Sequence, residues 1–192
     1  PSRSGIAAAR HRHGPMNEDS DLPAERALLS TGFLLAGFSL LSLEILWGRM
    51  TALTLGSSIH SYTITLSAVM GGIFAGSAYG GKRSSTAPPS AFFLFLFLYA
   101  VCSLLVSFSF LYLSNLMFFA KFHLPVPFRV SFYLMYAAVF LLIFVPSFFA
   151  GAVFPIAVQR LVRDASAAGA VAARLYMLNT MGAVIGSLLT GF

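Results

Sequence analysis

Glu44 is the first residue whose chemistry needs an explanation, because it is a carboxylic acid inside a long apolar run. The run extends from Leu28 to Arg49 and supplies the about 20 mostly apolar residues that a helix needs to cross a bilayer core of roughly 30 Å. An ionised side chain at that depth costs on the order of 2.5–3.5 kcal/mol even on lenient insertion scales. We therefore expect Glu44 to face protein or a water-filled cavity and to have a partner.

Two residues further along the chain are candidate partners for Glu44. Asn179 shares a helical stripe with Gly182 and Gly186, so its amide can approach a neighbouring helix closely. Pro155 lies inside an apolar run, where its missing N–H leaves a backbone carbonyl for a neighbour or water to satisfy. We predict a buried polar network in which Glu44 bonds Asn179 or the backbone around Pro155. Such a network either clamps the bundle or binds a proton or cation on a transport path.

The histidines and the single cysteine form no recognisable catalytic or metal-binding motif. His11 and His13 belong to a basic tail, and His60 and His123 are interpreted as anchors near one membrane face. Cys102 excludes an intrachain disulfide and a multi-cysteine metal site. We expect no catalytic residue, no metal and no cofactor, while the 20 phenylalanines suit contacts with lipid or with the tails of a pigment.

The composition is that of an integral membrane protein. Of 192 residues, 58% are hydrophobic and 9% are charged, and the mean hydropathy is +0.84. An ordinary soluble domain has roughly 25% charged residues. The net charge of +6 is explained by basic loops that hold the helices in place, so no nucleic-acid partner is expected.

The helices that must position Glu44 are predicted from the apolar runs and the turn residues between them. We expect an all-α, polytopic transmembrane bundle that occupies residues 27–192 and follows a disordered or peripheral cytoplasmic tail over residues 1–26. An interfacial segment is predicted for residues 114–130, where two prolines follow aromatic and basic residues. About five spans are predicted, over residues 28–49, 59–80, 91–113, 132–158 and 175–192.

Glycines repeat every four residues in two of these spans. Gly72, Gly76 and Gly80 share one stripe of the second span, and Gly182 and Gly186 share one stripe of the fifth. Small residues at this spacing allow two helix backbones to approach closely, so helix packing is the preferred interpretation. A substrate path lined by the same glycines is the alternative.

Aromatic and basic residues near the span ends are predicted to anchor the bundle at the interface. They are Trp47, Arg49, Lys121 and Arg129. Arg49 lies five residues beyond Glu44, about 140° around an ideal helix, so it is expected to extend to the outer interface and not to pair with Glu44.

The positive-inside rule places the N-terminus in the cytoplasm. With that orientation nine of the 12 Lys and Arg residues lie inside, and the three outside are Arg49, Lys121 and Arg129. The inner residues are Arg3, Arg10, Arg12, Arg26, Lys82, Arg83, Arg160, Arg163 and Arg174.

Taken together, several blocks of the sequence resemble the membrane portion of the bacterial fused spermidine-synthase-like proteins, whose spans are similar to half of a major-facilitator transporter. The resemblance covers about residues 30–192. It rests on the blocks Leu43–Arg49, Leu55–Ser58, Gly71–Gly81, Gly151–Pro155 and Leu175–Gly186. It implies a multi-pass protein of the bacterial cytoplasmic membrane.

The same resemblance assigns aminopropyl transfer to a soluble domain outside the membrane spans. No Gly-rich loop follows a strand here, and after the N-terminal acidic patch only Glu44 and Asp164 remain to bind an amine. We therefore expect this chain not to be an enzyme by itself.

Three functional classes stay open. The first is a non-catalytic anchor or scaffold, either a subunit of a larger membrane complex or the membrane part of a spermidine-synthase-like protein. The second is half of a transporter for a cationic or small polar solute, which predicts a water-accessible cavity at Glu44 and a second copy or partner subunit. The third is a membrane-bound aminopropyltransferase whose catalytic domain lies outside this chain.

Overall fold

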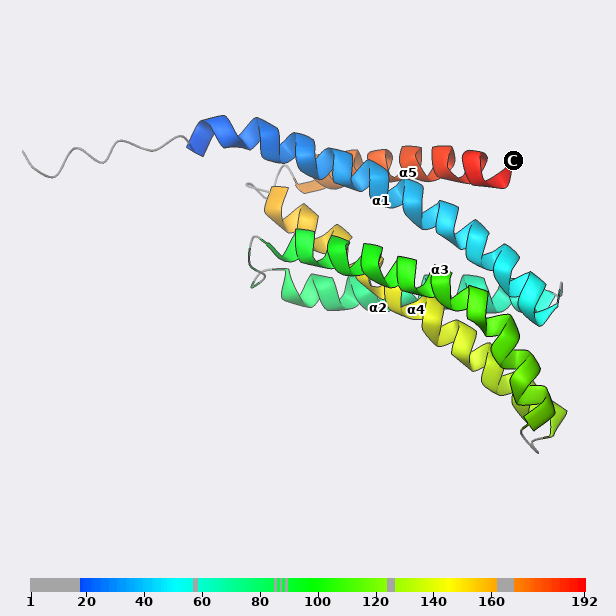
Figure 1. The fold of residues 1–192 in the computed structure, drawn as a ribbon. Coiled ribbons are helices and arrows are strands. Elements are labelled where there is room, and N and C mark those ends of the chain that lie inside the picture. The colour runs from blue at the N-terminus through cyan, green and yellow to red at the C-terminus, as the bar shows by residue number, and fades with distance from the viewer. Residues whose placement is uncertain are drawn as a thin grey trace, which may run out of the picture.

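The computed structural model describes residues 18–56, 59–84, 86, 88, 90–123, 127–161 and 168–192. Within the helices, the side chains at 18–26, 114, 116–118, 120–123 and 128 lie outside that description. The described residues form five helices, shown in Figure 1: α1 (Glu18–Leu55), α2 (Ile59–Arg83), α3 (Ala91–His123), α4 (Phe128–Leu161) and α5 (Ala168–Gly191).

The predicted all-α membrane bundle is confirmed. Four helical stretches are long and apolar enough to cross a membrane: Ala27–Leu55, Ala91–Leu113, Arg129–Leu161 and Ala168–Gly191. The second helix, α2, has 25 residues and is therefore long enough, but its many glycine, serine and threonine residues make it less apolar than the other four. The chain is thus a multi-pass helical bundle of about five spans.

Two boundaries differ from the sequence prediction. The first helix already begins at Glu18, inside the segment expected to be a polar tail; residues 1–17 lie outside the described chain. Within the segment predicted to be interfacial, residues 114–123 belong to α3, which continues to His123. No Gly or Pro interrupts residues 114–123, and Pro127 lies at the start of α4, where its carbonyl accepts the Val130 amide at 2.9 Å.

Successive helices run in opposite directions, so α1, α3 and α5 are parallel to one another and antiparallel to α2 and α4 (Figure 1). The most extensive contacts are not between neighbours in sequence: α1 packs on α5, and α2 packs on α4. The remaining helix, α3, lies mainly against α4. The bundle is therefore built from two parallel helix pairs, with α3 added to the second.

A reciprocal glycine contact joins α2 to α4. A Cβ atom built on Gly76 would collide with the carbonyl oxygen of Phe148, and one built on Gly151 would collide with the carbonyl oxygen of Ile73. Each glycine therefore lies three residues after the carbonyl that contacts the partner helix. Only a residue without a side chain allows the two backbones to come this close.

The same arrangement joins α1 to α5. A Cβ on Gly182 would collide with the carbonyl oxygen of Leu34, and one on Gly37 would collide with the carbonyl oxygen of Asn179. Again each glycine follows the contacting carbonyl by three residues. Two helix pairs, far apart in sequence, thus share one packing motif.

The other glycines of the two predicted stripes lie in the same seams. An added Cβ would lie 2.6 Å from Ser147 Cβ at Gly72, 2.8 Å from Pro155 Cγ at Gly80, and 2.7 Å from Ser42 Oγ at Gly186. These glycines contact a neighbouring helix and do not line an open path.

Both prolines of α4 lie within one uninterrupted helix. Pro155 has no N–H, so the carbonyl of Gly151, four residues earlier, loses its helical partner. The hydroxyl of Ser77 on α2 donates to that carbonyl at 3.0 Å. The expectation that a neighbour satisfies the carbonyl freed by Pro155 is therefore confirmed, and α4 continues through both prolines without a break.

The first helix ends at a glycine with a left-handed backbone. Gly56 has a φ of 95°, a conformation that favours glycine at the end of a helix. Its carbonyl oxygen accepts a hydrogen bond of 2.7 Å from Ser61 Oγ. This contact fixes the start of α2 relative to the end of α1.

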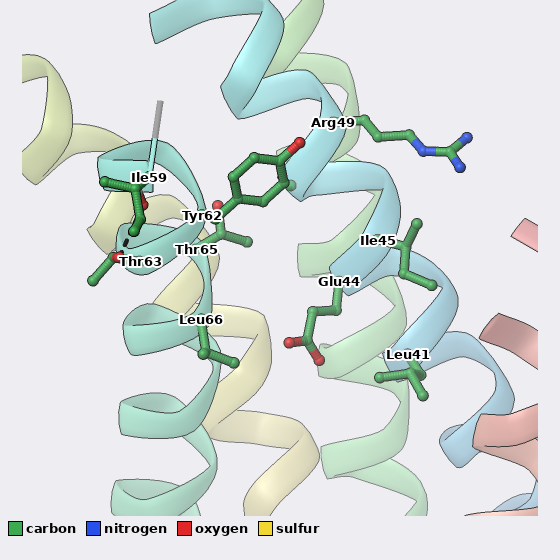
Figure 2. A pocket seen from close by; sticks show the side chains of 10 residues that line it. Leu41, Glu44, Ile45, Arg49, Ile59, Tyr62, Thr63, Thr65 and Leu66 are labelled. Carbon is green, nitrogen blue, oxygen red and sulfur yellow. Dashed lines mark hydrogen bonds between the residues drawn. The ribbon is translucent and has the colours of Figure 1, made fainter. Parts of the chain in front are cut away.

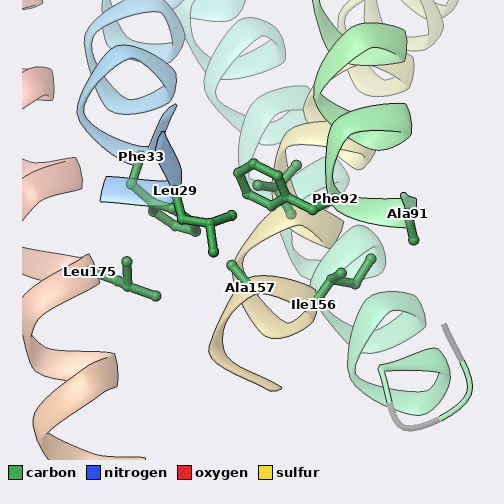
Figure 3. Close-up of a cluster of buried hydrophobic side chains, with 8 residues drawn as sticks. Leu29, Phe33, Ala91, Phe92, Ile156, Ala157 and Leu175 are labelled. Carbon is green, nitrogen blue, oxygen red and sulfur yellow. The ribbon is translucent and has the colours of Figure 1, made fainter. Parts of the chain in front are cut away.

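Buried apolar side chains form two clusters. The first gathers residues of α1, α3, α4 and α5, and includes Leu29 and Phe33, whose ring centroid is 6.1 Å from that of Phe92 (Figure 3). The second joins α1, α2, α3 and α4 around Trp47. The two clusters together hold α1 against the rest of the bundle. Glu44 lies one helical turn before Trp47, which belongs to the second cluster.

Candidate functional site

Glu44 lies near the middle of the apolar stretch Ala27–Leu55. Its side chain is half-buried and points from α1 towards α2 (Figure 2). Within the described part of the chain, its carboxylate makes no hydrogen bond and no ion pair. The acid therefore has the depth expected from the sequence but lacks a protein partner there.

A pocket of about 470 Å³ opens between α1 and α2 at this carboxylate. Four aliphatic side chains and the ring of Tyr62 provide most of its wall, and two threonine hydroxyls add polar groups. The lining residues are Leu41, Glu44, Ile45, Gly48, Arg49, Ile59, Tyr62, Thr63, Thr65 and Leu66.

The threonine hydroxyls of the pocket already use their protons. Thr63 Oγ1 donates to the carbonyl of Ile59 at 2.9 Å, and Thr65 Oγ1 donates to the carbonyl of Ser61 at 3.0 Å. Thr65 Oγ1 also lies 3.3 Å from the fully buried Thr51 Oγ1, and this contact joins α2 to α1. Neither threonine proton is therefore available to a ligand, and the carboxylate of Glu44 is the strongest hydrogen-bond acceptor among the lining groups.

The structure does not bring the three members of the predicted polar network together. The backbone carbonyl and side-chain oxygen of Asn179 lie against Gly37, which precedes Glu44 by about 10 Å of helix. Pro155 lies against Gly80 in the other helix pair. Glu44, Asn179 and Pro155 therefore occupy three different helix contacts.

Trp47, predicted to be an interface anchor, is instead completely buried. Its indole Nε1 donates to Ser107 Oγ on α3 at 3.2 Å, and that serine in turn donates to the carbonyl of Ser103 at 2.9 Å. The interface interpretation is wrong because the large ring fills the contact between α1 and three other helices and does not face headgroups.

The basic residues near the span ends have different surroundings. Arg49 is exposed, and its Nη2 atom donates to the carbonyl of Gly191 on α5 at 2.7 Å. The guanidinium is directed away from Glu44 (Figure 2), in agreement with the expected lack of a pair within α1. Arg129 is exposed at the start of α4, whereas the side chain of Lys121 lies outside the described part.

The remaining reactive residues stay scattered. His60 is exposed in the first turn of α2, and Cys102 is a half-buried thiol on α3. His11 and His13 lie outside the described residues, as does the side chain of His123. Among the residues with described positions, no group of three or more His, Cys, Asp and Glu could hold a metal ion.

Sequence reasoning missed the hydroxyl groups that join the helices. Thr51 with Thr65 links α1 to α2, and Ser39 Oγ lies 3.0 Å from Tyr99 Oη, which links α1 to α3. Tyr62 was also missed as the aromatic wall of the pocket. Its sequence signal was the run from Ser61 to Thr65, which carries four of the hydroxyl groups of α2.

Comparison with protein-family models, with curated proteins and with solved structures finds no match to this chain.

Proposed function

We propose that the chain is a non-catalytic membrane module that anchors or scaffolds a larger assembly. The observation that carries this proposal is the exposure of the α1/α5 pair: only 17% of the apolar window of α1 and 11% of that of α5 is buried inside the chain. The outward side chains of α5 include Tyr176 and Leu189, which are 66% and 71% exposed. A pair of apolar helices with so little of its surface buried favours a further helix or subunit on its exposed face.

A cysteine on α5 tests the scaffold directly. Thr180 is exposed and its hydroxyl donates only to the carbonyl of Tyr176, at 2.8 Å, so Thr180→Cys in a Cys102→Ser background is expected to fold normally. In native membranes, a reagent that joins a maleimide to a photoreactive benzophenone bonds the cysteine thiol and, on illumination, inserts into a C–H bond of the adjacent protein, so it is expected to shift this variant to a defined higher mass. The matched control is Leu104→Cys on α3, whose side chain is 61% exposed and which should give no such band.

The cross-linked band identifies the partner, since its mass separates a second copy of the chain from another subunit. An α5 cysteine that reacts with membrane-soluble maleimide but never cross-links would contradict the scaffold. A band of equal strength from both positions would indicate random collision and would count against it as well.

A second candidate function is half of a transporter for a cationic or small polar solute. The observation in its favour is the pocket at Glu44, since a closely packed Glu44 would have favoured a purely structural role. Polar residues inside membrane helices frequently mark solute or ion pathways. Two such halves would be needed to enclose a path.

The proposed relationship to the membrane part of spermidine-synthase-like proteins is supported by the sequence blocks described above. Translating the coding sequence on both sides of these residues tests it. A downstream domain with a Gly-rich strand-to-helix loop would favour a membrane-bound aminopropyltransferase, while an unrelated flanking sequence would contradict it. A bacterial cytoplasmic membrane with the N-terminus inside belongs to the same proposal.

A further inference from the structure

We propose that the pocket between α1 and α2 is a binding site for a small organic monocation, an ammonium group on an apolar body. The inference extends the second candidate function to a class of ligand, and it requires binding only, not transport. It rests on the acceptor groups, the charge and the size of the pocket.

The acceptor groups select the charge of the ligand. Glu44 supplies two carboxylate oxygens that no described residue occupies, and the hydroxyl protons of Thr63 and Thr65 are bound to carbonyls of their own helix and so cannot reach an anionic ligand. Such a pocket satisfies a ligand rich in N–H donors and leaves an anion unsatisfied. The ring of Tyr62 adds a surface that attracts cations.

The number of charges limits the ligand to one positive charge. Glu44 is the only acid among the lining residues, and the one cationic lining residue, Arg49, directs its guanidinium away from Glu44 and donates to the carbonyl of Gly191. One ammonium therefore neutralises the Glu44 carboxylate. A second positive charge on the ligand would lie in an apolar surrounding without a counter-charge, which is costly.

The size and the wall of the pocket favour an organic ligand over a bare metal ion. At about 470 Å³ the pocket is in the roughly 300–1,000 Å³ range of small-molecule sites and far exceeds the about 30 Å³ that one water occupies. Leu41, Ile45, Ile59 and Leu66 provide an aliphatic wall that would contact the hydrocarbon part of the ligand.

The test measures binding to the purified full chain in lipid nanodiscs by isothermal titration calorimetry. Four probes with the same four-carbon body are compared: n-butylammonium, n-butanol, butyrate and the dication of 1,4-diaminobutane. n-Butylammonium is expected to bind at least tenfold more tightly than each of the other three. Equal affinity for butanol would reduce the site to an apolar pocket and overturn the proposal, and tighter binding of the dication or of butyrate would also overturn it.

Variants then locate the site. Glu44→Gln keeps the size of the side chain and removes the charge. It is therefore expected to weaken the binding of n-butylammonium at least tenfold and to leave the affinity for n-butanol unchanged. Thr180→Val on α5, distant from the pocket, should bind like the wild type. Sodium chloride at 100-fold excess over the amine should not compete for the pocket. Full competition by sodium would mean that the site binds an alkali-metal ion and not an organic cation.

A purely structural Glu44 makes the opposite prediction for the ligand-free protein. If the carboxylate clamps the bundle, Glu44→Gln lowers the thermal midpoint; if it awaits a cation, the variant is at least as stable as the wild type without ligand. The comparison of the four probes uses the wild type alone, so a variant that fails to fold does not remove the test. A failed amine test leaves the α5 cross-link, and with it the scaffold, unaffected.

Discussion

Replacing Gly76 by alanine is expected to destabilise the bundle by about 1–3 kcal/mol or more, the usual range for overpacking a close contact. The added methyl group would collide with the carbonyl oxygen of Phe148, and backbone cannot move aside as a flexible side chain can. The helices α2 and α4 must then separate along their whole seam, since Gly72 and Gly80 lie in the same contact.

The matched control is Gly81→Ala in the same helix. A Cβ at Gly81 has no atom within 4 Å, so the only expected effect is the better helix propensity of alanine, up to about 1 kcal/mol in favour of the variant. Unfolding of both variants is measured in the same detergent by circular dichroism at increasing SDS or temperature. Equal stability of the two variants would contradict the close backbone approach of α2 and α4.

Replacing Trp47 by alanine is expected to lower the free energy of unfolding by about 3 kcal/mol or more. The ring is fully buried among residues of four helices, so its removal leaves a cavity that these helices cannot easily fill. Within a membrane, this lost packing is what counts, because lipid offers the ring an equally apolar surrounding. Thermal unfolding in detergent, followed by near-UV circular dichroism of the remaining aromatic residues, measures the effect.

Two control variants separate the effect of losing the Trp47 ring from that of losing its hydrogen bond and from that of any truncation in α1. Ser107→Ala removes the 3.2 Å hydrogen bond alone and is expected to cost only about 1 kcal/mol. Leu53→Ala changes a side chain of the same helix that is 87% exposed, and its effect should stay within about 0.5 kcal/mol in detergent. A Trp47→Ala variant as stable as Leu53→Ala would mean that the ring lies at the interface after all.

The fold could be predicted largely from the sequence, because the medium dictates it. Apolar runs of spanning length become helices in lipid, where every backbone group needs an internal partner. The four-residue glycine spacing of α2 and α5 also pointed to close helix contacts. Their partners were not predictable: the stripe on α5 does not indicate that Leu34 and Phe38 of α1 face it, since α1 is apolar on nearly all sides.

The central residue of the candidate site could be predicted from the sequence, but the residues that surround it could not. Glu44 was identified because a charge in an apolar run is costly, but its direction depends on how α1 is rotated about its axis. That rotation is set by Gly37 against Asn179 and by Trp47 against α3, contacts between residues 60 or more positions apart. Trp47 was misplaced for the same reason, since tertiary packing overrode the preference of tryptophan for the interface.

The pairing of the first helix with the last, and of the second with the fourth, has a consequence for biogenesis. A ribosome adds about 5–20 residues per second, so α1 leaves it roughly ten seconds before α5 exists. During that interval the backbone at Gly37, which later contacts Asn179 of α5, faces the translocon, a chaperone or lipid. Insertion of the early helices therefore needs a temporary companion, and ribosome-bound chains stalled before α5 should be the ones that quality-control proteases recognise.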